Sequence, residues 1–98
     1  MVVWDEPVRF EWDEGNKDKN WHKHHVTPAE SEEVFFDPHK RFLPVSAQTN
    51  KEKRHLLIGR THGKRTLFVV FTIRKGAVRI ISVRDLNTKE RNLYEKVP

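Results

Sequence analysis

Two apolar runs separated by a three-residue link constrain this chain more than any other feature. Residues 66–73 read TLFVVFTI, residues 77–84 read AVRIISVR, and Arg74-Lys75-Gly76 joins them. Both runs are rich in Val, Ile, Phe and Thr, which favour the pleated surface of a sheet. A short link that contains glycine is typical of a hairpin turn. We therefore expect the chain to fold around a β-hairpin.

The two runs differ in the faces that they present. The first run is apolar on both faces, which is typical of a central strand covered on two sides. Strict alternation in the second run places Ser82 and Arg84 on the same face as Val78 and Ile80, and Arg79 on the opposite face. A basic, hydroxyl-bearing edge is therefore expected to extend from an apolar sheet, and we expect function at that edge.

Three further segments are predicted to form strands. Residues 8–12 alternate apolar and polar side chains, as a half-buried strand does, and residues 54–60 read RHLLIGR. A short strand over residues 42–45 would contain Pro44, which confines it to a sheet edge. Residues 46–53 are predicted to be a polar loop.

Capping signals mark the starts of three helices, predicted over residues 14–24, 28–36 and 88–96. An N-cap side chain accepts a hydrogen bond from a free backbone amide of the first turn, and a glutamate three residues later completes a capping box. The residues that predict these starts are Asp13 for the first helix, Thr27 with Glu30 for the second, and Asn87 with Glu90 for the third.

The order of these elements predicts one α+β domain over residues 1–98. Consecutive strands joined by short loops favour an antiparallel arrangement. We therefore expect a small antiparallel sheet of four to five strands, with two N-terminal helices and one C-terminal helix. Residues 1–7 are either a tail or an extra edge strand.

The charged residues are divided unevenly between the two halves of the chain. Residues 1–50 contain six Lys and Arg and ten Asp and Glu, a net charge of −4, whereas residues 51–98 contain thirteen and four, a net charge of +9. A basic half of this size favours an anionic partner, most simply a phosphate backbone. The alternative is the solvated surface of an ordinary basic protein.

The sequence argues against several classes of site. It contains no cysteine, so it can form neither a disulfide framework nor a thiolate metal site, which fits a reducing cytoplasm. It contains no P-loop, dinucleotide fingerprint or serine-hydrolase motif. No apolar run approaches the roughly 18 residues of a membrane-spanning helix, and the N-terminus has no signal-peptide pattern. We expect a cytoplasmic protein that does not bind a membrane.

Arginines on the predicted strands are the first candidates for chemistry. A guanidinium makes two parallel hydrogen bonds to a phosphate. Fixed cations also stabilise the charge that builds on the phosphoryl oxygens when the 2′-hydroxyl of RNA attacks the adjacent phosphorus. The alternative is that these arginines are solvated or paired with Asp85, Glu90 or Glu95. The candidates are Arg54, Arg60, Arg79 and Arg84, together with Ser82.

Six histidines are the second candidates. His22, His24 and His25 lie together at the predicted end of the first helix, but their spacing matches no standard zinc site and we expect no metal. His55 and His62 flank the predicted strand 54–60 near arginines, where an imidazole can exchange protons near neutral pH. A surface position without chemistry is the alternative for each of them.

The final predicted helix carries Glu90, Arg91 and Tyr94. Glu90 and Tyr94 are four residues apart and therefore share one face of the helix. Either side chain can take part in proton transfer. The alternative, which we favour for Glu90, is that Glu90 caps the helix while Tyr94 packs on the sheet.

An ordered series of short motifs resembles the BrnT toxin family. The motifs that carry most of the specificity are FEWD at residues 10–13, IGRT at residues 58–61 and RIISVR at residues 79–84, in that order. The supporting matches are Lys23-His24, VFFD at residues 34–37, and Glu90-Arg91 with Tyr94. The resemblance covers about residues 10–95, which is nearly the whole chain.

This resemblance implies a ribonuclease toxin of a type II toxin–antitoxin pair, with a RelE-like fold. Such a toxin would cleave RNA without a metal ion or another cofactor and thereby inhibit translation. Its partner would be a BrnA-like antitoxin, whose ribbon-helix-helix part dimerises and binds operator DNA. The pair would then form a hetero-oligomer that represses its own operon. The alternative is a non-catalytic module that uses the same arginines to bind nucleic acid or the antitoxin, and acts as a co-repressor.

The resemblance and the charge distribution together imply roles for particular side chains. The predicted catalytic residues are Arg60, Arg79, Arg84, Lys23, His24 and His55; the arginines would stabilise the phosphate, and one of the other three would transfer the proton. The predicted RNA-binding residues are Arg54, Ser82, Tyr94 and Arg91.

Two departures from the family pattern bear on the candidate site. His25 stands where the family usually has a glycine after Lys23-His24, and histidine adopts the left-handed conformation of such a turn less easily. Lys53 stands where the family often has a glutamate directly before Arg54. If that carboxylate is the general base in the family, its role in this chain falls to another group.

Overall fold

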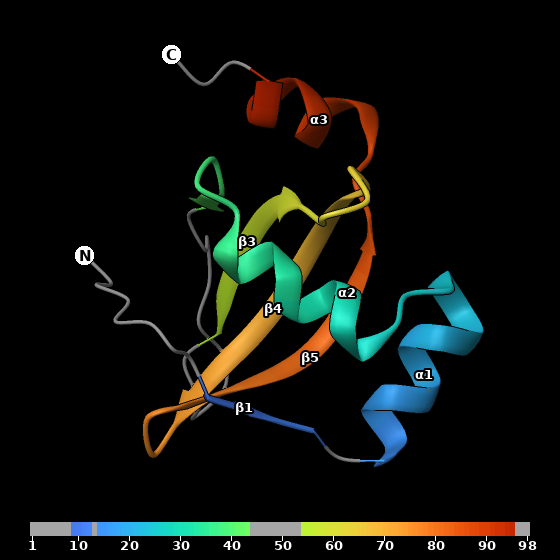
Figure 1. Cartoon of the computed structure of the whole chain (residues 1–98), viewed down its shortest axis with the longest axis vertical. Helices are drawn as coiled ribbons and strands as arrows, with labels where there is room; N and C mark the ends of the chain where they lie inside the picture. The colour runs from blue at the N-terminus through green and yellow to red at the C-terminus, as the bar shows by residue number, and fades with distance from the viewer. Residues whose placement is uncertain (1–8, 13, 44–53, 96–98) are drawn as a thin grey trace.

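The computed structural model describes residues 9–12, 14–43 and 54–95 and shows an α+β fold built on one five-stranded sheet (Figure 1). The strands are β1 (Arg9–Glu11), β2 (Arg41–Leu43), β3 (His55–Arg60), β4 (Thr66–Arg74) and β5 (Ala77–Asp85). The helices are α1 (Glu14–His24), α2 (Pro28–Glu33), which continues as the 3₁₀ turn η1 (Val34–Phe36), and α3 (Thr88–Glu95). The predicted fold class is confirmed. The predictions for residues 1–7, for Asp13 and for the loop 46–53 fall outside the described residues.

The sheet has the strand order β1-β5-β4-β3-β2. The pairings β2–β3, β3–β4 and β4–β5 are antiparallel, as predicted, and β2 lies at an edge. Strand β1 is parallel to β5, with Arg9 opposite Ala77 and Glu11 opposite Arg79. The sheet is therefore mixed rather than wholly antiparallel, because helices and not a short hairpin connect β1 to the strands that follow it.

The main core lies between the sheet and the segment formed by α2 and η1, which crosses in front of the sheet in Figure 1. The ring of Phe35 meets the rings of Phe10 and Phe71 edge to face, with centroids 5.2 Å and 5.0 Å away. The buried residues of this core are Val26, Val34, Phe35, Leu57, Leu67, Val69, Phe71, Val78, Ile80 and Val83.

Helix α1 is a polar helix that lies beside β5 (Figure 1). Its contact with the strand includes a buried amide: Asn20 is 2% exposed, and its Oδ1 accepts a hydrogen bond of 3.2 Å from the backbone N–H of Val83. A buried backbone amide that lacked this partner would destabilise the fold. The position of α1 is therefore fixed by a specific polar contact as well as by packing.

Helix α3 covers the opposite face of the sheet at one end. Ile58, Leu86 and Tyr94 form a smaller buried cluster there, with Leu43 and Phe68 packed against it. Strand β4 is consequently apolar on both faces, as predicted, because its residues contribute alternately to the main core and to this second cluster.

A β-bulge in β5 changes which side chains share a face. Val70 of β4 pairs with Ser82, but the next residue, Phe71, pairs with Ile80, so Ile81 is an extra residue on β5. The strict alternation predicted from the sequence is therefore wrong beyond Ile80. Since Ile80 and Val83 both point into the main core, Arg79, Ser82 and Arg84 all lie on the opposite face.

Local sequence signals account for the helix starts and the hairpin. The capping box of α2 is formed: Glu30 N–H donates to Thr27 Oγ1 at 3.1 Å, and Thr27 N–H donates to Glu30 Oε1 at 3.0 Å. The predicted box between Asn87 and Glu90 is also formed. The β4–β5 hairpin closes through Lys75 and Gly76, whose positive φ angles of 51° and 78° suit a type I′ turn.

Gly59 allows η1 to pack closely on β3. A Cβ at this position would lie 2.7 Å from Val34 Cγ1 and 3.3 Å from Asp37 Oδ2. We expect Gly59→Ala to lower the free energy of unfolding by about 1–3 kcal/mol, measured by urea denaturation. Gly63→Ala is the matched control, because its Cβ would meet only Thr61 Oγ1, at 3.8 Å. Equal stability of the two variants would contradict the close packing.

Candidate functional site

A buried carboxylate, Asp37, joins three elements at the α3 end of the sheet. It is 8% exposed and accepts hydrogen bonds from Tyr94 Oη at 2.6 Å, from Arg60 N at 2.7 Å and from His39 N at 2.9 Å. Burial by itself would raise the pKa of Asp37, but these hydrogen bonds outweigh burial and hold the pKa below its usual value. Asp37 therefore acts as an ionised anchor between η1, β3 and α3.

Tyr94 is the partner of this anchor on α3. Its side chain is buried, its hydroxyl donates to Asp37, and burial together with that contact raises its pKa to about 12. The guanidinium of Arg60 lies 5.2 Å from the centroid of its ring. The geometry matches the alternative in which Tyr94 packs on the sheet, and its predicted contact with RNA stays a prediction.

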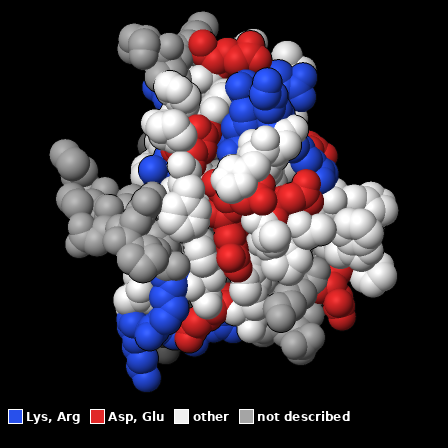
Figure 2. Space-filling view, viewed as in Figure 1, with Lys and Arg blue, Asp and Glu red and all other residues white. Residues whose placement is uncertain are grey.

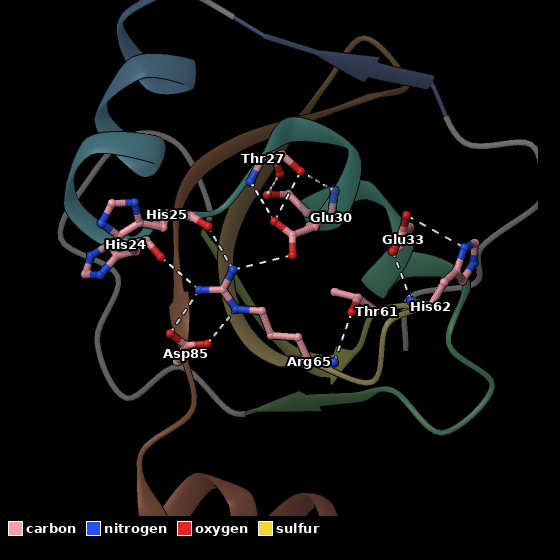
Figure 3. Close-up of polar contacts among 10 residues, drawn as sticks. His24, His25, Thr27, Glu30, Glu33, Thr61, His62, Arg65 and Asp85 are labelled. Carbon is pink, nitrogen blue, oxygen red and sulfur yellow. Dashed lines mark hydrogen bonds and ion pairs between the residues drawn. The ribbon is translucent and has the colours of Figure 1, made fainter.

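Arg65 forms a second polar centre, between α1, α2 and β5 (Figure 3). Its Nε and Nη2 donate to the two oxygens of Asp85 at 2.8 Å and 3.0 Å. Nη2 and Nη1 also donate to the backbone carbonyls of His24 and His25, each at 2.8 Å, and Nη1 contacts Glu30 at 3.4 Å. One guanidinium thus holds the end of α1 against the end of β5.

This contact brings predicted site residues together around Asp85. The hydrogen bonds from Arg65 lower the pKa of Asp85 against the opposing effect of burial, and the nearby His24 and Arg91 contribute to the lowering. Lys23 is exposed beside the half-buried His24 in the last turn of α1. We name Lys23, His24, Asp85 and Arg91 the α1–β5 corner. It combines a histidine, an ionised carboxylate and two cations.

The turn that follows His24 has the conformation that the family pattern suggests. His25 adopts φ 53°, and its N–H donates to the carbonyl of Trp21 at 2.8 Å, which closes the helix with a left-handed residue. Histidine therefore occupies the conformation for which glycine is usually selected. Lys53 lies outside the described residues.

Arg84 stands next to this corner but is already paired. Its two terminal nitrogens donate to the two oxygens of Glu90, both at 2.8 Å, and its guanidinium lies 4.1 Å from the centroid of Phe68. The hydrogen bonds from Arg84 lower the pKa of Glu90 despite burial. The carboxylate pairing that the sequence left as an alternative is therefore present for Arg84, which is held rigidly between α3 and the sheet.

The structure separates the remaining predicted residues from the corner. Arg79 is five residues from Arg84 along β5, a span of about 16 Å. Arg54 is exposed before the start of β3, and His55 stacks on Phe71 with ring centroids 5.1 Å apart. Ser82 lies between Arg79 and Arg84 on their face of the sheet. The ten predicted residues therefore do not form one cluster.

Sequence reasoning missed the two polar centres. In the sequence, Asp37 stands out only as the last residue of the VFFD motif, and Arg65 belongs to none of the motifs. Both bind partners that are far away in the sequence, such as Tyr94 for Asp37 and His24 for Arg65. A possible signal for Asp37 is its position directly after three apolar residues, where a carboxylate is forced to the edge of the core.

Charge is arranged in zones on the face seen in Figure 2. Lys and Arg gather near α3 and at the β4–β5 hairpin, with Asp and Glu between them over α2. Helix α2 carries Glu30, Glu32 and Glu33. This acidic zone repels a polyanion, so an anionic ligand that reaches both basic regions is expected to avoid the α2 face.

The described part of the chain contains neither a metal-binding cluster nor a membrane-spanning helix. Among residues 9–12, 14–43 and 54–95, no group of three or more His, Cys, Asp and Glu side chains is placed to hold a metal ion. None of the described helices has the length and apolar character needed to cross a bilayer.

Comparison with known proteins gives one family and one fold. A family model described as the ribonuclease toxin BrnT of a type II toxin–antitoxin system matches residues 12–90. The 1.1 Å crystal structure of the Brucella abortus ribonuclease toxin BrnT is similar, with a TM-score of 0.63 and 24% sequence identity, over 83% of this chain and 99% of that chain. At this identity the structural likeness shows the fold alone. No curated protein matches the sequence.

Tyr94→Phe tests the Asp37 anchor. The variant removes one hydrogen-bond donor from the buried carboxylate of Asp37, so we expect the free energy of unfolding at neutral pH to fall by about 1.5–3 kcal/mol. The pKa of Tyr94 is raised from 10.0 to about 12, so the stability it contributes is present below pH 10 and lost as the pH rises through about 12. The variant lacks this alkaline loss. Thermal unfolding across this range measures both effects, and superimposable curves would contradict the anchor.

Arg65→Lys tests the second centre. Lysine keeps the positive charge but cannot donate two parallel hydrogen bonds to Asp85. We therefore expect the free energy of unfolding, measured with denaturant, to fall by about 2–3 kcal/mol. Because Arg65 lowers the pKa of Asp85, the wild-type contribution is present above the ordinary value of 3.8 and is lost as the pH falls through the lower folded value. The variant should lose less stability on acidification. Arg91→Lys, at an exposed position, is the control, and an equal effect of both changes would refute the prediction.

Proposed function

This chain belongs to the BrnT family of ribonuclease toxins of type II toxin–antitoxin systems, and we propose that it is a metal-independent endoribonuclease whose cleavage of RNA inhibits translation. The match over residues 12–90 carries the proposal, because it includes Lys23, His24 and Asp85 of the α1–β5 corner as well as Asp37 and Arg65. A type II toxin has an antitoxin partner. We propose that this partner is a BrnA-like protein with a ribbon-helix-helix part, which covers the toxin and brings it to operator DNA.

The α1–β5 corner offers the groups that RNA cleavage needs. In the proposed reaction the 2′-hydroxyl of the ribose attacks the adjacent phosphorus, a base takes its proton, and the bond to the 5′-oxygen breaks as that oxygen gains a proton. The products are a 2′,3′-cyclic phosphate and a 5′-hydroxyl. An imidazole exchanges protons near neutral pH, so His24 is the proposed proton-transfer group. The ionised carboxylate of Asp85 places a negative charge near this imidazole.

Positive charge around the corner would stabilise the reacting phosphate. Lys23 and Arg91 are exposed and can approach phosphoryl oxygens directly. Arg84 is held in place by Glu90 and Phe68, so it supplies a fixed cation that needs no reorganisation during the reaction. Arg60 adds a further cation on the ring of Tyr94 at the same end of the sheet. In this proposal the arginines and the lysine supply the charge that a metal ion provides in other nucleases.

The His24→Ala variant separates this role from a structural one. Arg65 holds His24 through its backbone carbonyl, so removal of the imidazole leaves that contact intact. We expect the rate of RNA cleavage by the purified protein in the presence of a metal chelator to fall about 10²–10⁴-fold, with little change in thermal stability.

The matched control for this test is His62→Ala. His62 is exposed on the β3–β4 turn, and only its backbone N–H and a weak ring contact meet Glu33. Wild-type cleavage by the His24 variant would contradict the proton-transfer role. Regulated expression in a bacterium, with and without the antitoxin, tests the wider proposal: normal growth and intact RNA in cells that hold folded wild-type protein would refute the toxin and favour a binding module.

A further inference from the structure

A pocket at the other end of the sheet is not used by the proposed reaction. It has a volume of about 270 Å³ and lies where β1 meets β5 and the β4–β5 hairpin. Its lining combines three cations, one carboxylate and one indole. The lining residues are Glu11, Trp12, Arg74, Lys75 and Arg79. Such a set is suited to a ligand that has both a negative charge and an aromatic ring.

The pairing of β1 with β5 and the β4–β5 turn bring the lining residues of the pocket together. The parallel register of β1 and β5 sets Glu11 beside Arg79. The hairpin turn brings Lys75 to the same place, and Arg9 Nη2 ties β1 to this turn through a hydrogen bond of 2.9 Å to the Lys75 carbonyl. Trp12 Nε1 donates to Glu32 Oε2 at 2.7 Å, which fixes the indole. These two hydrogen bonds fix the indole of Trp12 and the backbone that carries Lys75.

The bulge in β5 gives the strand a basic face that begins at this pocket. Because Ile81 is the extra residue, Arg79, Ser82 and Arg84 follow one another on a single face of the strand. That face is the one opposite the main core and the acidic α2. A polyanion along this face of β5 would meet Arg79 at one end and Arg84 about 16 Å away at the other. The indole of Trp12 packs against the main core beside Glu32, so the pocket lies between this basic face and the acidic one.

We infer that this pocket binds one nucleotide of the RNA strand at a distance from the cleaved bond. Arg79 and Lys75 contact its phosphate, and the indole of Trp12 stacks on its base. Arg79 then contributes to RNA binding and not to the reacting phosphate, which refines the role given to it by the sequence. The inference rests on the proposed function, since it takes RNA as the ligand.

Binding can be measured apart from cleavage. A single-stranded 2′-O-methyl RNA lacks the attacking hydroxyl and is not cut, so its Kd reports only on contacts. We expect Arg79→Ala to raise the Kd about tenfold, as loss of a charged hydrogen bond does. The slope of log Kd against log salt concentration should fall by about 1, because one phosphate contact is lost.

A second variant protects the test against misfolding. Lys75→Asn removes the cation but creates an Asn-Gly turn, which is the favoured pair for a type I′ hairpin, so its melting temperature should equal or exceed that of the wild type. We expect this variant to bind the 2′-O-methyl RNA more weakly all the same. Lys40→Ala is the control for loss of a charge, because Lys40 precedes β2 at the far edge of the sheet.

The outcomes distinguish this inference from the proposed function. If both pocket variants bind the 2′-O-methyl RNA as tightly as Lys40→Ala does, the pocket is not an RNA site, even if the wild-type protein cleaves RNA. If both variants bind weakly and the wild type cleaves nothing, the pocket stands as an RNA site while the ribonuclease proposal fails. Failure of the wild type to bind this RNA at all would overturn the inference.

Discussion

The guanidinium of Arg65 is the contact on which the geometry of the candidate site depends. Helix α1 is polar, and its described contacts with the sheet include the buried amide of Asn20. The guanidinium of Arg65 donates hydrogen bonds to the carbonyls of His24 and His25 on one side and to Asp85 on the other. These hydrogen bonds tie the last turn of α1 directly to the end of β5. The arrangement of the α1–β5 corner is thus a consequence of one side chain from the β3–β4 turn.

Features with a local cause could be predicted from the sequence, and features with a distant cause could not. The capping boxes and the Lys75-Gly76 turn depend on residues within a few positions of one another, so their spacing was sufficient. The bulge at Ile81 depends on how β5 fits β4, and a single extra residue reverses the face of every residue beyond it. The family resemblance draws attention to His24 as part of a motif, but only the fold places His24 near Asp85.

The net charge of the second half of the chain overstates how many basic side chains can bind a ligand. The basic second half predicted an anionic partner, yet Arg65 and Arg84 are both engaged by carboxylates within the fold. Such pairs are structural, because removing one partner leaves the other charge partly buried. On the face seen in Figure 2, Lys and Arg gather in two regions, one near α3 and one at the hairpin. The net charge of a sequence does not say which charged side chains pair with each other inside the fold and which face a ligand, since this depends on contacts between residues that are distant in the sequence.

The departure from the family pattern at His25 alters a side chain and not the geometry of the site. Arg65 uses the backbone carbonyls of His24 and His25, so the left-handed turn is required whatever residue occupies it. A non-glycine residue in this conformation costs about 1–2 kcal/mol. The ring of His25 packs edge to face on Trp21 with centroids 5.3 Å apart, which offsets part of that cost. Arg65 can bind the carbonyls of His24 and His25 only when residue 25 is left-handed, and this requirement is the constraint at the position. A glycine meets it without steric cost, and here a histidine that packs on Trp21 meets it as well.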